Sequence, residues 1–168
     1  MEIELILPDP EATDRAGAAL GSCISPGLLI TLSGELGAGK TALVRAMLRA
    51  LHIPGRIKSP TFSRVELYEV SKLSLYHFDF YRVEDPAELD AAGFREYFRP
   101  DAVCLVEWPE RAGEFLRKAD VAITLDFLES GRTLRARAFT PQGEPCLTAL
   151  AALRNHCGSI SSGDASAG

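Results

Sequence analysis

The segment SGELGAGKTAL, residues 33–43, constrains the fold and the chemistry of this chain more than any other. Gly34 is followed by four residues and then by Gly39, Lys40 and Thr41, which is the full pattern of a phosphate-binding loop. The glycines permit backbone conformations that other residues resist, so consecutive N–H groups can point at one phosphate. In such a loop Lys40 places a positive charge on the β- and γ-phosphates, and the Thr41 hydroxyl is placed to ligate Mg²⁺. The segment therefore predicts nucleotide binding.

The sequence on either side of this loop predicts how the loop is held. Residues 28–32, LLITL, form a continuous apolar run that is typical of a buried strand. Leu43, Met47 and Leu51 recur every fourth residue, with Arg45 on another face, which is the pattern of an amphipathic helix. That helix would direct its positive end at the same anion. We therefore expect an α/β fold of the P-loop NTPase type, with a mixed β-sheet, the P-loop strand inside it, and helices on both faces.

The rest of the chain alternates between strand and helix patterns. We expect strands at residues 2–7, 61–70, 73–83, 102–107, 121–128 and 131–140, and helices at about 10–23, 85–94, 111–119 and 149–154. The Asp9-Pro10 pair is typical of a helix start. The strands at 61–70 and 73–83 are expected to form an antiparallel pair with a turn near Ser71. We expect a single domain over residues 1–154 and a disordered tail, rich in Gly, Ser and Ala, over residues 155–168.

Composition and charge argue against several classes of protein. The 168 residues are 46% apolar, enough for one sizeable core, and no apolar run approaches the ~20 residues that a membrane helix needs. The acidic start of the chain lacks the basic region of a targeting signal, so we expect a cytoplasmic protein that does not engage a membrane. The net charge of −5 argues against direct binding of a nucleic-acid backbone.

Cysteine and histidine are scattered and give no sign of a zinc site or a disulfide. No two cysteines form a CxxC pair, and we expect reduced thiols. The residues concerned are Cys23, Cys104, Cys146, Cys157, His52, His77 and His156.

Two carboxylates are candidates to complete a magnesium shell beside the loop. A P-loop nucleotide needs a carboxylate at the end of a neighbouring buried strand. Glu107 ends the apolar run AVCLVE, and Asp79 lies in YHFDFYR, where strand alternation puts His77, Asp79 and Tyr81 on one face. A solvated polar face is the alternative explanation for Asp79, and a helix-capping carboxylate is the alternative for Glu107.

The tetrapeptide SPTF, residues 59–62, has two explanations. It is a common Ser-Pro turn, or it is a loop whose Ser59 or Thr61 hydroxyl meets the γ-phosphate or the attacking water.

Four segments in this order, GELGAGKT, KSPTF, YHFDFYR and LVEWPER, resemble the TsaE family over roughly residues 3–150. Members of that family are small bacterial ATPases required for making N6-threonylcarbamoyladenosine at position 37 of tRNAs that read ANN codons. The resemblance implies Mg²⁺ on Thr41 and Glu107, with Asp79 near the γ-phosphate. Together with the loop motif and the SPTF segment, this makes Lys40, Asp79 and Thr61 the residues expected to act in hydrolysis. It also implies adenine-side contacts from Thr13 and Arg132, and it places Trp108 in the lining of the site. The residues of the loop implied to contact ATP are Glu35, Leu36, Gly37, Ala38, Gly39, Lys40 and Thr41.

This chain departs from the family pattern at one position of the loop. The family often has a second Thr after the magnesium Thr, and this chain has Ala42. A hydroxyl that could touch the α-phosphate is therefore absent, which bears on affinity and not on the mode of binding.

The resemblance implies an accessory ATPase that works with TsaB-like and TsaD-like proteins and meets tRNA indirectly, through that complex. We expect weak turnover by the chain alone, because Arg82 and Arg111 are the only internal candidates for an arginine finger, and surface ion pairs explain them as well. A small-molecule P-loop kinase is the main alternative, with Arg132, Arg135 and Arg137 as a lid, although their alternation favours a strand. The chain lacks the guanine-binding segment of small GTPases, which argues against that class. A module that binds a nucleotide without hydrolysing it is a further alternative.

Overall fold

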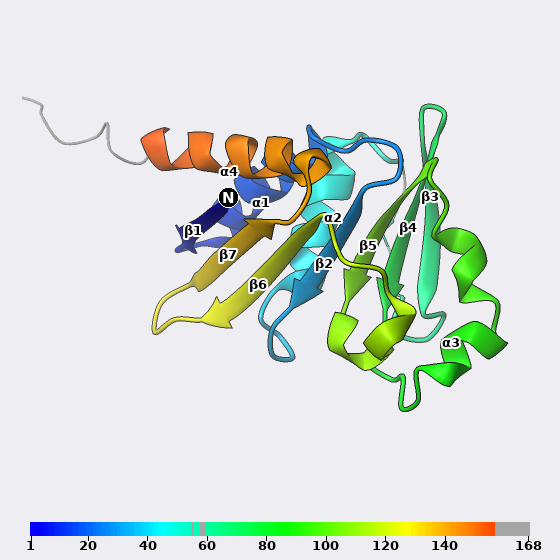
Figure 1. Cartoon of the computed structure of the whole chain (residues 1–168). Helices are drawn as coiled ribbons and strands as arrows, with labels where there is room; N and C mark the ends of the chain where they lie inside the picture. The colour runs from blue at the N-terminus through cyan, green and yellow to red at the C-terminus, as the bar shows by residue number, and fades with distance from the viewer. Residues whose placement is uncertain (55, 58–59, 157–168) are drawn as a thin grey trace, which may run out of the picture.

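The computed structural model describes residues 1–54, 56–57 and 60–156, and within them the chain forms one seven-stranded sheet (Figure 1). The strands are β1 (Glu2–Leu7), β2 (Leu29–Ser33), β3 (Val65–Val70), β4 (Leu73–Asp79), β5 (Ala102–Glu107), β6 (Val121–Phe127) and β7 (Arg132–Ala138). The helices are α1 (Pro10–Gly21), α2 (Lys40–Ala50), α3 (Ala87–Ala91) and α4 (Glu144–His156), with short 3₁₀ turns η1 (Phe94–Tyr97), η2 (Pro109–Phe115) and η3 (Pro141–Gly143).

The sheet is mixed, and the strand that precedes the loop lies at its centre. The strand order is β1-β7-β6-β2-β5-β4-β3. β2 runs parallel to both β5 and β6, and β4 runs parallel to β5, whereas the pairs β1–β7, β6–β7 and β3–β4 are antiparallel. The carboxyl ends of β2, β4 and β5 therefore meet at one edge of the sheet, which is where ligands bind in open α/β sheets. The predicted mixed sheet and antiparallel pair are confirmed.

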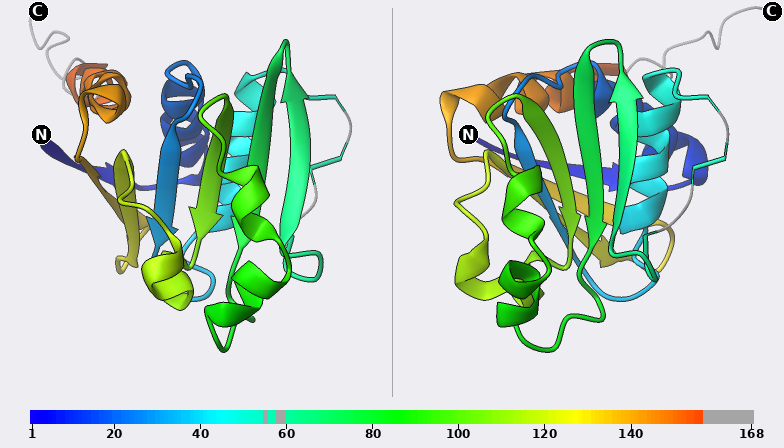
Figure 2. Two further views of the ribbon diagram at one scale, coloured as in Figure 1. Left: turned by 45° about the vertical axis from the view of Figure 1, so that its right-hand side comes forward. Right: turned by 90° about the vertical axis from the view of Figure 1, so that its right-hand side faces the viewer.

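Helices cover both faces of the sheet, as expected. Figure 2 shows α1 and α2 on one side and the short helices around α3 on the other. The first side holds an aliphatic core in which Leu20 and Met47 from the helices meet Ile30 and Leu105 from the sheet, and α4 packs there too. The second side holds a core rich in aromatic rings, with Phe78 at its centre. Because β2 and β5 are covered on both faces, they read as continuous apolar runs.

The first helix starts and packs as its sequence indicates. Asp9 caps it, since its Oδ1 accepts a hydrogen bond from the N–H of Ala12 at 2.7 Å, and Pro10 occupies the first helical position. A Cβ on Gly17 would lie 2.3 Å from the Cβ of Ala46, so the glycine allows α1 to approach α2 closely. This contact places the first turn of α1 next to the start of α2.

Three helix predictions were wrong in extent. The helix expected at 85–94 covers only Ala87–Ala91, and a separate 3₁₀ turn begins at Phe94. The last helix was expected at 149–154 but begins at Glu144, because Cys146, Leu147 and Leu150 already form a buried stripe against the sheet. The helix expected at 111–119 is a 3₁₀ segment that Gly113 interrupts, with φ of 51°. Residues 155 and 156 of the predicted tail belong to α4, and residues 157–168 lie outside the described part of the chain.

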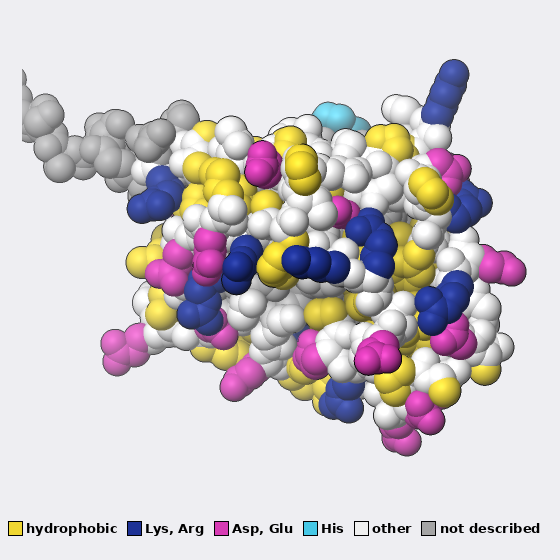
Figure 3. Space-filling view, viewed as in Figure 1, with side chains coloured by type: hydrophobic (Ala, Val, Ile, Leu, Met, Phe, Trp, Pro, Cys, Tyr) yellow, Lys and Arg dark blue, Asp and Glu magenta, His cyan; other side chains and the backbone are white. Residues whose placement is uncertain are grey.

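No helix of the described residues is both long and apolar enough to cross a membrane. Cys23, Cys104 and Cys146 are free thiols, and Cys157 lies outside the described residues. On the face shown in Figure 3, side chains of both charges are interspersed rather than gathered into one basic patch.

A buried carboxylate, Asp120, ties three strands together at the end of the sheet opposite the loop. Its Oδ2 accepts hydrogen bonds from the N–H of Leu29 and from Arg117, each at 2.8 Å, and its Oδ1 accepts one from the Thr140 hydroxyl at 2.7 Å. Burial alone would raise the pKa of Asp120, but the hydrogen bonds from Arg117, Leu29 and Thr140 outweigh it and hold the pKa below its ordinary value. The folded state therefore favours the ionised carboxylate.

We predict that Asp120→Ala lowers the free energy of unfolding by about 2–3 kcal/mol at neutral pH, because buried donors lose their acceptor. The pKa of Asp120 is lower in the folded than in the unfolded chain. The contribution of Asp120 to the free energy of unfolding is therefore fully present above the ordinary pKa of aspartate. It is lost as the pH falls through the lowered pKa of the folded state. Urea unfolding at neutral and acid pH measures this.

The exposed Asp126, which pairs with Arg135, supplies the matched control, and we expect Asp126→Ala to cost less than about 0.5 kcal/mol. A cost for Asp120→Ala that equals this control, or that does not shrink in acid, would contradict the assignment.

Candidate nucleotide site

The predicted strand, loop and helix are present, and the loop joins β2 to α2 at the carboxyl edge of the sheet. Gly34, Gly37 and Gly39 have φ of 136°, 80° and 106°, which L side chains rarely adopt. At Gly34 a Cβ would also lie 2.2 Å from the carbonyl oxygen of Leu125, so only glycine fits there. No side chain caps the start of α2, which leaves its first N–H groups available to an anion.

Lys40 lies inside this loop and not in solvent. Its side chain is buried, at 4% exposure, and Nζ donates hydrogen bonds to the carbonyl oxygens of Gly34 and Glu35, at 2.6 and 2.8 Å. The ammonium also lies 4.0 Å from the ring centroid of Trp108. Burial lowers the pKa of Lys40 below its ordinary value, against the opposing fields of Glu107, Glu110 and Asp79. The cation is thus held where a phosphate on the loop would meet it.

The two predicted carboxylates lie side by side. Asp79 ends β4 and Glu107 ends β5, and the two are directly paired in the parallel register. Their exposed fractions are 6% and 2%, so Asp79 is not on a solvated polar face. Glu107 is hydrogen-bonded to the side chains of Thr41 on α2 and His77 on β4, so its carboxylate does not serve as a helix cap.

The two predicted magnesium ligands are in direct contact. The Thr41 hydroxyl donates to both oxygens of Glu107, at 2.9 and 3.0 Å. Among the described residues no group of three His, Cys, Asp or Glu side chains could enclose a metal. One carboxylate and one hydroxyl nevertheless suit Mg²⁺, which usually keeps several waters and takes its other ligands from substrate phosphates. The pair fits a metal that arrives with a nucleotide.

Asp79 connects this pair to the predicted SPTF loop. Its Oδ2 accepts a hydrogen bond from the Thr61 hydroxyl at 3.1 Å, and its Oδ1 accepts one from the N–H of Tyr81 at 3.0 Å. Of the two hydroxyls expected near the γ-phosphate, Thr61 is therefore beside a carboxylate, and Ser59 lies outside the described residues.

Two cavities flank the loop and share Gly39 and Ala42. The smaller, of about 240 Å³, brings together the residues that were expected around the phosphates and the metal. They are Leu36, Gly37, Lys40, Thr41, Thr61, Asp79, Glu107 and Trp108. Ala42 is exposed to both cavities without a hydroxyl, so the departure from the family pattern lies at the position that the sequence indicates.

The larger cavity, of about 460 Å³, lies on the other side of the loop and contains both residues expected near adenine, Thr13 of α1 and Arg132 of β7. Arg132 also supports the loop, because its Nε donates to the carbonyl oxygen of Ala38 at 3.0 Å and its guanidinium lies 4.6 Å from the ring centroid of Phe127. The structure thus gathers these residues around one loop, with Gly39 and Ala42 lining both cavities. Of the residues expected to contact ATP, Glu35 alone lines neither cavity and contributes its carbonyl group to Lys40.

Sequence reasoning assigned no role in the site to two residues, Tyr81, which lines the smaller cavity, and His77. His77 is completely buried and its Nε2 lies 2.8 Å from Oε1 of Glu107. The signal was present, because strand alternation already placed His77 on the face of Asp79. Only the pairing of β4 with β5 shows that this face also carries Glu107.

The family model described as threonylcarbamoyl adenosine biosynthesis protein TsaE matches residues 7–135. A protein of Haemophilus influenzae named tRNA threonylcarbamoyladenosine biosynthesis protein TsaE is 40% identical over 123 residues, which cover 73% of this chain and 78% of the relative. A protein of the same name from Bacillus subtilis is 36% identical over 135 residues, covering 80% and 83%. The crystal structure of YdiB from Bacillus subtilis superposes with a TM-score of 0.74 at 28% identity, covering 94% of this chain and 97% of that one. The chain therefore belongs to the TsaE family.

Proposed function

We propose that this protein binds ATP with Mg²⁺ and hydrolyses it as an accessory protein of the complex that makes N6-threonylcarbamoyladenosine at position 37 of tRNAs reading ANN codons. The observation that carries the proposal is the contact of Thr41 with Glu107 beside a glycine loop that also holds Lys40. The pathway is taken from the names of the relatives, which are tRNA threonylcarbamoyladenosine biosynthesis proteins. We propose a cytoplasmic location, which suits a protein that takes part in tRNA modification.

The two cavities divide the nucleotide between them. The N–H groups at the start of α2 and the ammonium of Lys40 face the phosphates. The adenosine half takes the larger cavity, where Thr13 and Arg132 offer a hydroxyl and a guanidinium. Thr41 and Glu107 would hold Mg²⁺, which when bound neutralises charge on the β- and γ-phosphates.

Asp79 and Thr61 are the groups best placed to act on the attacking water. The carboxylate of Asp79 lies in the phosphate cavity and already accepts a hydrogen bond from Thr61. A carboxylate in that place can accept a hydrogen bond from water and direct its lone pair at phosphorus. Lys40 would stabilise the charge that develops on the phosphoryl oxygens.

The site lacks an arginine among the residues described around the phosphate cavity. Arg82 is exposed, with its guanidinium 4.7 Å from the ring centroid of Phe62, and Arg111 is exposed as well. Such an arginine is worth about 10³–10⁵ in rate. We therefore propose that TsaB-like and TsaD-like partners complete the site and that tRNA is met only through them.

Exposed apolar side chains beside the cavity support a protein partner. Leu36 of the loop is 67% exposed and Phe62 is 86% exposed. Leu36 lines the phosphate cavity and Phe62 follows Thr61 of that lining, so both are available to a protein that docks there. The net charge of −5 also suits a protein partner better than RNA.

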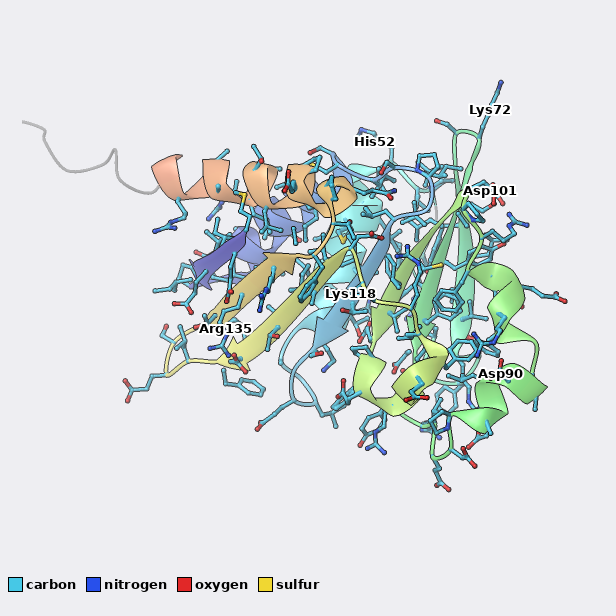
Figure 4. All side chains as sticks on the ribbon, viewed as in Figure 1. His52, Lys72, Asp90, Asp101, Lys118 and Arg135 are labelled. Atoms are coloured by element: carbon cyan, nitrogen blue, oxygen red, sulfur yellow. The ribbon has the colours of Figure 1, made fainter. Side chains whose placement is uncertain are left out.

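The kinase alternative has no support from the family match. Its lid was to come from Arg132, Arg135 and Arg137, but all three lie on β7. Arg132 supports the loop, and Arg135 projects from the sheet and pairs with Asp126 (Figure 4).

Lys40→Ala is expected to weaken ATP binding by about 10- to 100-fold, because charge-assisted hydrogen bonds of about 1.5–3 kcal/mol are lost. Lys118→Ala is the matched control, since Lys118 is exposed and lies against Phe139 (Figure 4). Because burial lowers the pKa of Lys40, affinity in the unsubstituted protein also falls as the pH rises toward that pKa, and the variant lacks this dependence. Calorimetry measures both effects. If Lys40→Ala leaves the affinity for ATP unchanged, the assignment of residues 34–41 as the phosphate-binding loop is wrong.

Glu107→Ala and Asp79→Ala are expected to separate binding from turnover. The first weakens the Mg²⁺-dependent part of ATP binding, because Glu107 contacts Thr41. The second leaves binding nearly intact and slows phosphate release, because Asp79 contacts Thr61. Asp101→Ala, at the other end of the sheet, should change neither (Figure 4). The opposite pattern would exchange the roles of the two carboxylates.

Steady-state phosphate release is expected to be slow for the chain alone and faster with TsaB-like and TsaD-like proteins and tRNA. Parallel assays with GTP and with small acceptor molecules separate a GTPase and a kinase from the proposed activity. Fast turnover that the partners leave unchanged counts against the accessory role.

A further inference from the structure

His77 occupies a layer of the sheet directly below the proposed metal site. It lies on β4, two residues before Asp79 and on the same face, with an exposed fraction of 0%. Leu75, two residues further back on that face, is also fully buried. An apolar side chain is therefore accommodated in the adjacent position of this face, and the contact of Nε2 with Glu107, at 2.8 Å, is what the imidazole adds.

The hydrogen-bonding partners fix which nitrogen of His77 carries the proton. A carboxylate oxygen can only accept, so Nε2 must donate to Oε1 of Glu107. Nδ1 is buried and has no hydrogen-bond partner among the described residues. A buried N–H without an acceptor is costly, so Nδ1 carries the lone pair and the ring is the neutral Nε2–H tautomer.

This hydrogen bond limits how the Glu107 carboxylate can turn. Oε1 accepts from His77 and Thr41, whereas Oε2 accepts only from Thr41 among the residues that the structure describes. A glutamate has three side-chain torsions, and donors on both oxygens restrict the rotation of the carboxylate. Glu107 and Thr41 both line the phosphate cavity, so lone pairs left on Oε2 are available to a ligand there.

We propose that His77 is a positioning residue, which orients the carboxylate of Glu107 for the metal that accompanies the nucleotide. The inference rests on the proposed function, in which Glu107 holds Mg²⁺. Hydrogen-bonding partners of metal-ligating carboxylates fix the ligands in this way, and their loss typically weakens metal affinity by about 10- to 100-fold.

The test compares ADP affinity with Mg²⁺ and with EDTA in His77→Leu and His77→Gln. The ratio of the two affinities isolates the metal. We expect His77→Leu to lower this ratio about 10-fold while affinity in EDTA changes less than about 2-fold. His77→Gln, whose amide nitrogen reaches the place of Nε2, should restore most of the ratio. Binding of Mn²⁺ with ADP, followed by electron paramagnetic resonance, reads the same change without any turnover.

Two controls separate this inference from a loss of stability and from a failure of the proposed function. Tyr76→Phe changes the opposite face of β4 and should leave the ratio unaltered. Glu107→Ala should bring the ratio of the two affinities close to one, because the metal ligand is lost. If it does not, the proposed role of Glu107 fails and that of His77 with it. If Glu107→Ala abolishes the ratio and His77→Leu leaves it intact, His77 alone is refuted. An equal loss of affinity with and without metal in His77→Leu also overturns it.

The unsubstituted protein provides a measurement that does not depend on the folding of any variant. The two-bond nitrogen–proton correlations of ¹⁵N-labelled histidine report the tautomer directly. We expect His77 to show the neutral Nε2–H form. The Nδ1–H form would mean that Nε2 cannot donate to Glu107, and the proposal would be wrong.

Discussion

The hydrogen bond between Thr41 and Glu107 joins the first turn of α2 to the end of β5, and the geometry of the site depends on it. It holds because β2 and β5 are parallel neighbours, so the loop after β2 and the last residue of β5 reach the same edge of the sheet. β4 adds Asp79 in the next position. Three neighbouring strands and the helix after β2 thus place a hydroxyl and two carboxylates around one cavity.

The elements of the fold that could be predicted are those with local signals. The loop glycines, the apolar runs of β2 and β5, and the Asp9 cap each follow from residues close in sequence, and all are present. The family resemblance, carried by four motifs in order, supplied the set of site residues. Helix ends were predicted less well: α4 begins before its expected start because its first turn is buried by contacts with the sheet that no local pattern shows.

The parts of the site that could not be predicted depend on contacts between distant residues. His77 and Glu107 are 30 residues apart and meet only through the pairing of β4 with β5. Arg132 reaches the loop across 94 residues, and Asp120 reaches β2 across 91. Arg132 is one of the alternating arginines of β7 and gives no local signal of its contact with the loop, and Asp120 gives none of its contact with β2. The motif that contains His77 places it on the face of Asp79, but its contact with Glu107 becomes visible only when strand order and register are known.

Lys40 bridges the carbonyl oxygens of Gly34 and Glu35 and lies against Trp108, so the cation of the loop already has internal ligands. An incoming anion must compete with two backbone carbonyl groups and an aromatic ring for it. A polyphosphate chain can bind the ammonium of Lys40 and the free N–H groups of α2 at the same time. These several contacts offset the loss of the contacts that Lys40 makes within the protein. The internal contacts of Lys40 therefore favour a ligand that engages the loop at several points over one that makes a single contact.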